Sequence, residues 1–314
     1  MKGRGVHRES QRQSRKISCV TFHKTCHKKY QAGYRRWLVC GGVLFLLILI
    51  CAGGWMIPEE AVRGSFLEAK QPPSLRHWFG TDALGQDLFL RTIKGLGVSV
   101  TIGVAASLLS AAIAILVGIV TAAGNPTADR LIRWLIDLMM AVPHMIFILL
   151  ISFVMGKGLV GLLAGIAATH WCGLSRVIRA EVLQLRSRPY ILYSRKAGKS
   201  ERWILRHHLL PHLLPQLLTG MVLMFPHAVL HEASVSFLGF GLPPEQPSIG
   251  MILSESMRYL SAGMWWPAVL PGLTLAAVVL LIDGLGSCVQ EITGTGRETR
   301  DRTKQDRQRP WEEE

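Results

Sequence analysis

Six uncharged apolar runs constrain this chain more than any other feature of its sequence. A helix needs about 20 apolar residues to cross the hydrocarbon of a bilayer, with about 17 as the lower limit. The composition agrees, because only 18% of the 314 residues are charged, against about 25% in soluble proteins. The sequence therefore predicts an all-α, polytopic membrane protein with about six transmembrane helices. The six runs are 37–57, 98–123, 138–155, 159–175, 213–230 and 264–282.

A signal peptide is the alternative interpretation of the first run. Its basic lead of 36 residues is long for a signal peptide, and its 21 apolar residues exceed the usual signal-peptide core. Trp37 and Trp55 lie near the two ends of the run, where aromatic residues of a membrane-spanning helix meet the interface. We therefore interpret it as a transmembrane helix. The third, fourth and fifth runs are shorter, and they carry His144, His170 and His227.

The net charge of +14 suggests nucleic acid as a partner until its distribution is considered. If the chain crosses the membrane six times, segments on one side carry 28 of the 35 Lys and Arg residues. This asymmetry follows the positive-inside rule and predicts an inner-membrane protein with both termini in the cytoplasm. We expect no nucleic-acid binding, and we expect the basic segments to contact membrane lipid. Those segments are 1–36, 130–133, 176–206 and the chain after 296.

The cysteines and histidines of the N-terminal tail have a loose resemblance to a metal site. Cys19, His23, Cys26 and His27 lie close together, but their spacing matches none of the usual zinc patterns. All six cysteines fall in predicted cytoplasmic segments or in spans, where thiols stay reduced or buried. The sequence therefore predicts neither a disulfide framework nor a metal site in the tail.

The tripeptide Gly198-Lys199-Ser200 raises the question of whether the chain binds ATP. A phosphate-binding loop requires a glycine five residues before Gly198, and that position is Tyr193. A bulky residue there cannot form the tight turn that wraps phosphate oxygens. We expect no ATP site, no bound cofactor and no enzymatic activity on this chain. A transport component is the favoured class, with a membrane channel or an accessory membrane protein as the alternative.

Three segments resemble the signatures of the peptide/nickel group of ABC-transporter permeases. They are "FGTDALGQDLFLRTIKGLGVSV" (79–100), "SVSFLGFGLPPEQPSIGMIL" (234–253) and "WWPAVLPGLTLAAVVLLIDGLG" (265–286). The first departs from the family at Gln86, Leu90 and Gly97. The resemblance implies a type I ABC importer permease fold. It also implies a second homologous permease subunit, two ATPase subunits that bind the ATP, and an extracytoplasmic substrate-binding protein.

The same resemblance explains the segment around Gly198. In this family the long cytoplasmic loop, 179–212 here, carries an element that docks on the ATPase. The family's E-A-A triplet is replaced by residues 192–194. The domains expected are a basic tail (1–36), a permease domain (37–290) and a charged cytoplasmic tail (291–314). The docking residues implied are Tyr190, Arg195, Gly198, Ser200, Ile204, Leu210 and Pro211.

Histidines in the predicted spans bear on the solute. His227 and His231 are four residues apart, and Met224 precedes His227 by three, so the three side chains share one helix face. With His170 of the fourth run they resemble the C-type subunit of nickel permeases, and imidazole binds Ni²⁺ well. The resulting hypothesis is a path for nickel or a metal chelate. The alternative is a dipeptide or oligopeptide permease in which these residues only line the path.

The charge asymmetry predicts the sidedness of each loop. Reporter fusions after residues 90 and 250 should report an extracytoplasmic position, because these loops lie on the side with few Lys and Arg residues. Fusions after residues 127, 200 and 305 should report the cytoplasm. A cytoplasmic result at residue 90 would contradict the topology.

Overall fold

The computed structural model describes residues 38, 40–62, 64–123, 126–243 and 246–293. The chain divides into two compact units, residues 1–45 and 46–314, and helices α2 to α11 all belong to the second. Over the described ranges the chain is helical apart from loops and one β-bridge between Thr81 and Asp87. The cysteines and histidines of the N-terminal tail, where no metal site is predicted, lie outside the described residues.

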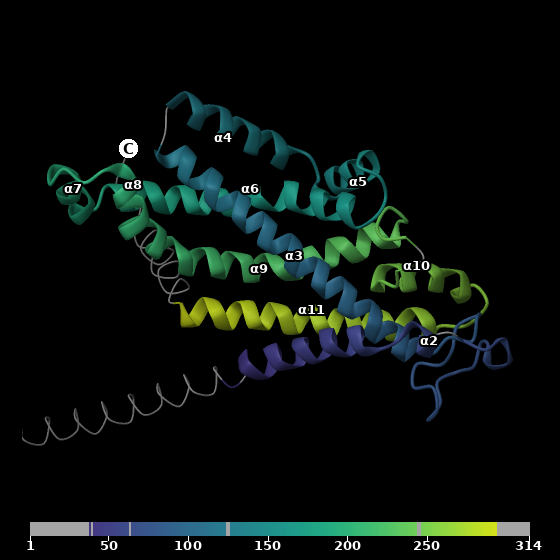
Figure 1. The fold of residues 1–314 in the computed structure, drawn as a ribbon. Helices are drawn as coiled ribbons and strands as arrows, with labels where there is room; N and C mark the ends of the chain where they lie inside the picture. The colour runs from purple at the N-terminus through teal and green to yellow at the C-terminus, as the bar shows by residue number, and fades with distance from the viewer. Residues whose placement is uncertain (1–37, 39, 63, 124–125, 244–245, 294–314) are drawn as a thin grey trace, which may run out of the picture. The chain divides into compact units, whose positions relative to one another are not determined.

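The labelled elements follow one another without a sheet (Figure 1). They are α2 (Glu59–Val62), η1 (Phe66–Glu68), α3 (Leu88–Ala123), α4 (Pro126–Ala141), α5 (His144–Val154), α6 (Leu159–Arg186), α7 (Pro189–Lys196), α8 (Glu201–Ile204), the π-helical turn η2 (Leu205–Leu209), α9 (Leu210–Phe237), α10 (Ile249–Leu260) and α11 (Trp266–Ile292).

Over the described residues, helices lie within all six of the predicted apolar runs. Three of them are long and apolar enough to span a membrane, at Leu88–Val120, Glu201–Phe237 and Trp266–Glu291. A fourth span arises if α4 and α5 are taken together, and the first run forms the shorter apolar helix Cys40–Met56. The all-helical, multi-span architecture is confirmed, while the count of six spans stays a prediction.

The third predicted span is wrong as a continuous helix. The run 138–155 is divided between α4 and α5, which meet at an angle of 98°. Pro143 lies at the break, with no N–H to continue the hydrogen-bond ladder of α4. Its ring also disfavours helical geometry at the preceding residue. The apolar run is therefore interrupted by backbone chemistry that hydropathy does not register.

Other helices extend beyond their apolar runs. α3 begins ten residues before the predicted start, and α6 continues to Arg186. Charged side chains in these extensions are paired: Arg179 forms two hydrogen bonds with Asp129 of α4, at 2.7 and 2.8 Å. Because pairing removes much of the cost of a charge inside the helix bundle, the helix does not end where the apolar residues end. The connection predicted over 179–212 is correspondingly shorter in the structure.

α3 lies at the centre of the second unit and packs against α6 and α9 (Figure 1). Two apolar clusters surround it. One joins α3, α5, α6 and the later part of α9, and the other joins α3, α4, α6 and the segment from α7 to the start of α9. Small residues let the helices approach closely, as is usual between helices in a membrane.

Gly165 of α6 shows how tight this packing is. A Cβ atom at residue 165 would lie 2.9 Å from the carbonyl oxygen of Ile148 in α5, so one helix would have to move. We expect Gly165→Ala to reduce the free energy of unfolding by about 1–3 kcal/mol, the usual effect of overpacking. Thermal unfolding in detergent measures the change.

Gly173, in the same helix, is the matched control, because a Cβ atom there meets nothing within 4 Å. Gly173→Ala should leave the stability unchanged or raise it by about 0.5–1 kcal/mol, since alanine favours a helix interior over glycine. Equal losses in the two variants would contradict the close approach of α5 and α6.

Candidate functional site

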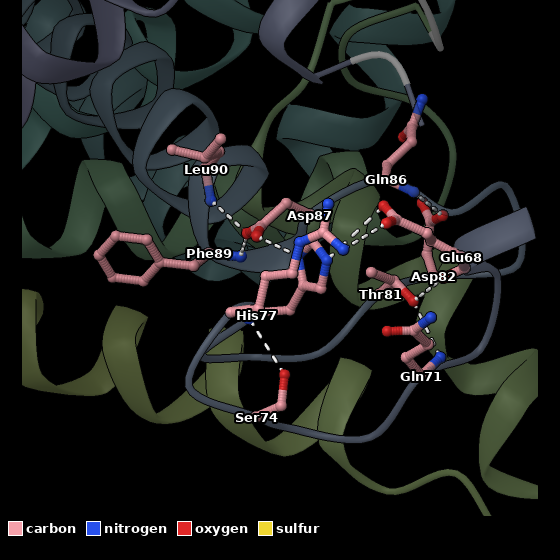
Figure 2. Close-up of polar contacts among 11 residues, drawn as sticks. Glu68, Gln71, Ser74, His77, Thr81, Asp82, Gln86, Asp87, Phe89 and Leu90 are labelled. Atoms are coloured by element: carbon pink, nitrogen blue, oxygen red, sulfur yellow. Dashed lines mark hydrogen bonds and ion pairs between the residues drawn. The ribbon is translucent and has the colours of Figure 1, made fainter. Parts of the chain in front are cut away.

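A polar cluster orders the loop that precedes α3 (Figure 2). The buried hydroxyl of Thr81 donates to the carbonyl oxygen of Glu68 and accepts the N–H of Gln71 at 2.9 Å. These contacts join segments ten and thirteen residues apart in the chain. A loop tied in this way presents a defined surface rather than a mobile one.

Two aspartates supply the other fixed points of this loop. Asp82 Oδ1 accepts the N–H groups of Leu84 at 2.8 Å and Gln86 at 2.9 Å. Asp87 Oδ1 accepts the N–H of Phe89 at 2.8 Å, which satisfies an otherwise unpaired amide in the first turn of α3. The other carboxylate oxygen of Asp87 lies 2.7 Å from His77 Nδ1, as Figure 2 shows.

Arg91 connects this loop to α10. Its guanidinium group lies 3.0 Å from Asp82 Oδ2 and 2.6 Å from Glu255 Oε2. The side chains of Asp82 and Arg91 are only 4% and 11% exposed, so this is a buried ion pair rather than a surface one. The pKa of Tyr259, near the end of α10, is raised. Burial of the side chain is the main cause, and the negative charges of Asp82 and Glu255 add to it. Asp82 and Arg91 lie in the segment 79–100 that resembles a family signature, but nothing in the sequence pointed to Glu255.

Three histidines from three helices meet inside the helix bundle. The ring of His170 in α6 lies 5.1 Å from that of His231 in α9, between centroids, and 6.2 Å from that of His144 at the start of α5. His231 Nδ1 lies 2.9 Å from the sulfur of Met145. His170 and His231, predicted as path residues, are thus brought together.

The remaining predicted path residues lie elsewhere. Met224 packs against the other apolar cluster, so Met145 rather than Met224 contacts the histidines. His227 is exposed on α9. In the described ranges, no group of three or more His, Cys, Asp or Glu side chains is arranged to hold a metal ion. The sequence offered one signal for His144 and Met145, namely the proline that precedes them.

The segment around Gly198 forms a compact turn between α7 and α8. Gly198 has φ +77°, a left-handed conformation that side chains disfavour, and a Cβ atom there would meet nothing within 4 Å. Ser200 caps α8 by accepting the N–H of Trp203 at 3.3 Å. Glu201 pairs with Arg195 at 2.6 Å and so closes the turn from both sides.

The predicted docking residues fall into two groups. Tyr190 and Gly198 are exposed and available to a partner, and Arg195 is partly exposed. Ile204 is wholly buried in the core, so its side chain supports the turn instead of forming a contact surface. Ser200 caps α8, and Leu210 and Pro211 begin α9.

Comparison with known proteins gives a family and several curated relatives. A family model described as "Binding-protein-dependent transport system inner membrane component" matches residues 114–290. The chain is 33% identical over 247 residues to the dipeptide transport system permease protein DppC of Bacillus subtilis (strain 168), covering 77% of each chain. It is 34% identical over 224 residues to the oligopeptide transport system permease protein OppC of the same strain, covering 70% of this chain and 73% of that one.

A further relative and a solved structure agree with these matches. A putative peptide transport system permease protein of Brucella suis biovar 1 (strain 1330) is 33% identical over 260 residues, covering 82% of this chain and 87% of that one. An inward-facing structure of the MetNI methionine ABC transporter matches with a TM-score of 0.54 at 18% identity. It covers 66% of this chain and 97% of that one. At this identity the match shows a shared fold.

The buried Asp82–Arg91 pair should matter more than an exposed one. Asp82→Asn keeps an oxygen for the amides of Leu84 and Gln86 but leaves Arg91 with only Glu255 as a counter-charge. We expect the free energy of unfolding to fall by about 3 kcal/mol, as when one partner of a buried pair is removed. Thermal unfolding and protease digestion of the loop measure this.

Asp137→Asn is the matched control. Asp137 pairs with Arg176, but the two side chains are 68% and 47% exposed, so solvent screens the pair. A loss of less than about 1 kcal/mol is expected. If the two variants lost a similar free energy of unfolding, the buried Asp82–Arg91 pair would contribute no more to stability than an exposed pair.

Proposed function

This chain belongs to the family of binding-protein-dependent transport system inner membrane components, and from that premise we propose that it carries short peptides across the inner membrane. It is a multi-pass permease subunit of an ABC importer and not an enzyme. Membership implies ATPase and binding-protein partners. The alternative of a non-ABC channel or accessory protein is therefore wrong.

The relatives supply the observation that favours peptides over nickel. Those described above are named for dipeptides, oligopeptides or peptides, and they align with 70–82% of this chain. This support favours the peptide alternative over the nickel or metal-chelate hypothesis drawn from the histidines. Membership of a fold family does not identify a solute by itself, so the solute remains a proposal.

The histidine cluster suits a peptide path. A neutral imidazole has one N–H donor and one acceptor nitrogen, and a peptide bond offers the matching acceptor and donor. His144, His170 and His231 are neither fully buried nor fully exposed, so a solute between the helices can reach them. Ionisable groups inside a membrane usually line a path. We assign these three side chains, with His227 on the exposed face of α9, to the walls of the peptide path.

The turn at Gly198 is the proposed contact with the ATPase. It lies between α7 and α8, where the chain carries many Lys and Arg residues, and this charge favours a cytoplasmic position. A short helix seated in a groove is a common way to couple two proteins. The full importer would contain a second homologous permease, two ATPases and an extracytoplasmic binding protein.

Uptake by the complete importer in proteoliposomes tests this function. ATP-driven accumulation of a labelled dipeptide or tetrapeptide is expected, and accumulation of radioactive nickel is not. Gly198→Glu should reduce peptide uptake roughly tenfold by weakening the coupling between the ATPase and the permease. Insertion of the variant into the membrane should be unchanged.

Gly263→Glu is the matched control, because Gly263 also has positive φ (+81°) and an open surrounding but lies between α10 and α11. It should retain peptide uptake. The metal hypothesis would be established instead by two results together. The wild-type importer would take up nickel and no peptide, and the double variant His227→Ala/His231→Ala would lose the nickel uptake. A silent Gly198→Glu would contradict the docking assignment.

A further inference from the structure

Glu232 is a fully buried acidic residue in α9 that neither the histidine path nor the docking turn uses. The hydroxyl of Ser236, one turn later, donates to Glu232 Oε1 at 2.8 Å. Within the described residues the second oxygen, Oε2, has no hydrogen-bond partner. Burial of a carboxyl group is costly, and acidic residues inside membrane helices mark functional positions. Glu232 therefore needs an explanation beyond packing.

Two serine hydroxyls connect Glu232 to the first turn of α10. Ser248 caps that helix, and its Oγ accepts the N–H of Met251 at 3.3 Å. Ser99 of α3 accepts the N–H of Ile249 at 3.4 Å. Both hydroxyls lie beside the carboxyl group of Glu232, whose Oε2 has no hydrogen-bond partner among the described residues. A serine that accepts through its oxygen can still donate its O–H, so each serine is in position to relay an amide of α10 to the carboxyl group.

The relays act at the positive end of a helix. The first amides of a helix carry a partial positive charge, which an acidic group nearby stabilises. α10 has 12 residues, and its N-terminus is the end that faces Glu232. Through Ser99 and Ser248 the carboxyl group of α9 therefore offers acceptor oxygens at the N-terminus of a helix to which it does not belong.

Close backbone contacts hold the same end of α10 in place. A Cβ atom at Gly250 would lie 2.1 Å from the carbonyl oxygen of Ala233 in α9. One at Gly95 of α3 would lie 3.1 Å from the backbone nitrogen of Ile249. The N-terminus of α10 thus touches two helices at backbone distance, and no larger residue fits at the contact points.

The rest of α10 contacts the polar cluster of the outer loop and α11. Glu255 pairs with Arg91 at 2.6 Å, and Ser256 donates to the carbonyl oxygen of Pro267 at 2.7 Å. α10 packs against α3, α9 and α11. α10 therefore lies between the loop shown in Figure 2 and Glu232, the residue that follows His231 in α9.

We propose that Glu232 is a positioning residue of the transport cycle. It anchors the first turn of α10, and α10 transmits the arrival of a loaded binding protein at the outer loop to the histidine-bearing part of α9. This second step rests on the proposed function, which places α10 on the extracytoplasmic side. The anchoring step rests on the contacts of Glu232 alone. If Glu232 had only a structural role, its loss would reduce stability and would lower basal and stimulated ATPase activity by the same factor.

The anchor is tested by hydrogen exchange in the complete importer. Glu232→Leu and Ser99→Ala each remove a partner of the relay, so the amides of residues 249–252 should exchange roughly tenfold faster. Glu232→Gln keeps an acceptor oxygen and should stay close to the wild-type rate. Ser110→Ala is the matched control: Ser110 is also a fully buried serine of α3, but it bonds only to Ala106 of its own helix. It should leave α10 unchanged.

Transmission is tested by ATPase activity with and without the loaded binding protein. Glu232→Leu should lower the stimulated activity roughly tenfold while basal activity stays within about twofold of wild type. Glu232→Gln should restore most of the stimulation. Should Glu232→Leu fail to assemble, Ser99→Ala carries the same prediction, because it breaks one relay and leaves the acid in place.

Either of two results overturns the proposal. Unchanged exchange over residues 249–252 in both Glu232→Leu and Ser99→Ala would show that the relay does not hold α10. An equal loss of basal and stimulated activity would make Glu232 a residue of stability only. Hydrogen exchange needs no solute, so failure of the peptide assignment would appear as missing peptide uptake in the wild type and would leave the exchange result intact.

Discussion

Hydrocarbon provides no partner for a backbone N–H or C=O group, and this constraint underlies the whole structure. A chain with six apolar runs of this length must satisfy its backbone within each run, which only a helix does. Helices are found over all six runs. The interruption at Pro143 follows from the same rule, because a proline withdraws one donor and turns the chain between α4 and α5.

Once the backbone is satisfied, the cost of burying polar side chains decides where the helices are joined. Arg91 joins the loop that precedes α3 to α10, and Arg179 joins α6 to α4. Each group is paired or hydrogen-bonded across elements distant in sequence. Apolar packing brings helices together without direction, so these few polar contacts give specificity to the arrangement.

The functional residues show how far sequence periodicity reaches. Helical spacing placed His227 and His231 on one face of α9, which holds within a single helix. The same spacing puts Met224 on that face, but it could not show that His231 also contacts Met145 from α5. Nor could it show that Ile204 is buried against the core. Both facts concern contacts between elements and not positions within one.

The sequence alone determined the helical class, the places of the apolar runs and the family motifs. These follow from local chemistry: the length of an apolar run and the spacing of side chains on one helix. Only the tertiary structure decided that His144, His170 and His231 meet, and that Glu232 lies against the N-terminus of α10. The reason is physical. The helical period sets the direction of each side chain within its own helix, but the crossing of separate helices depends on packing, close glycine contacts and the 98° turn at Pro143.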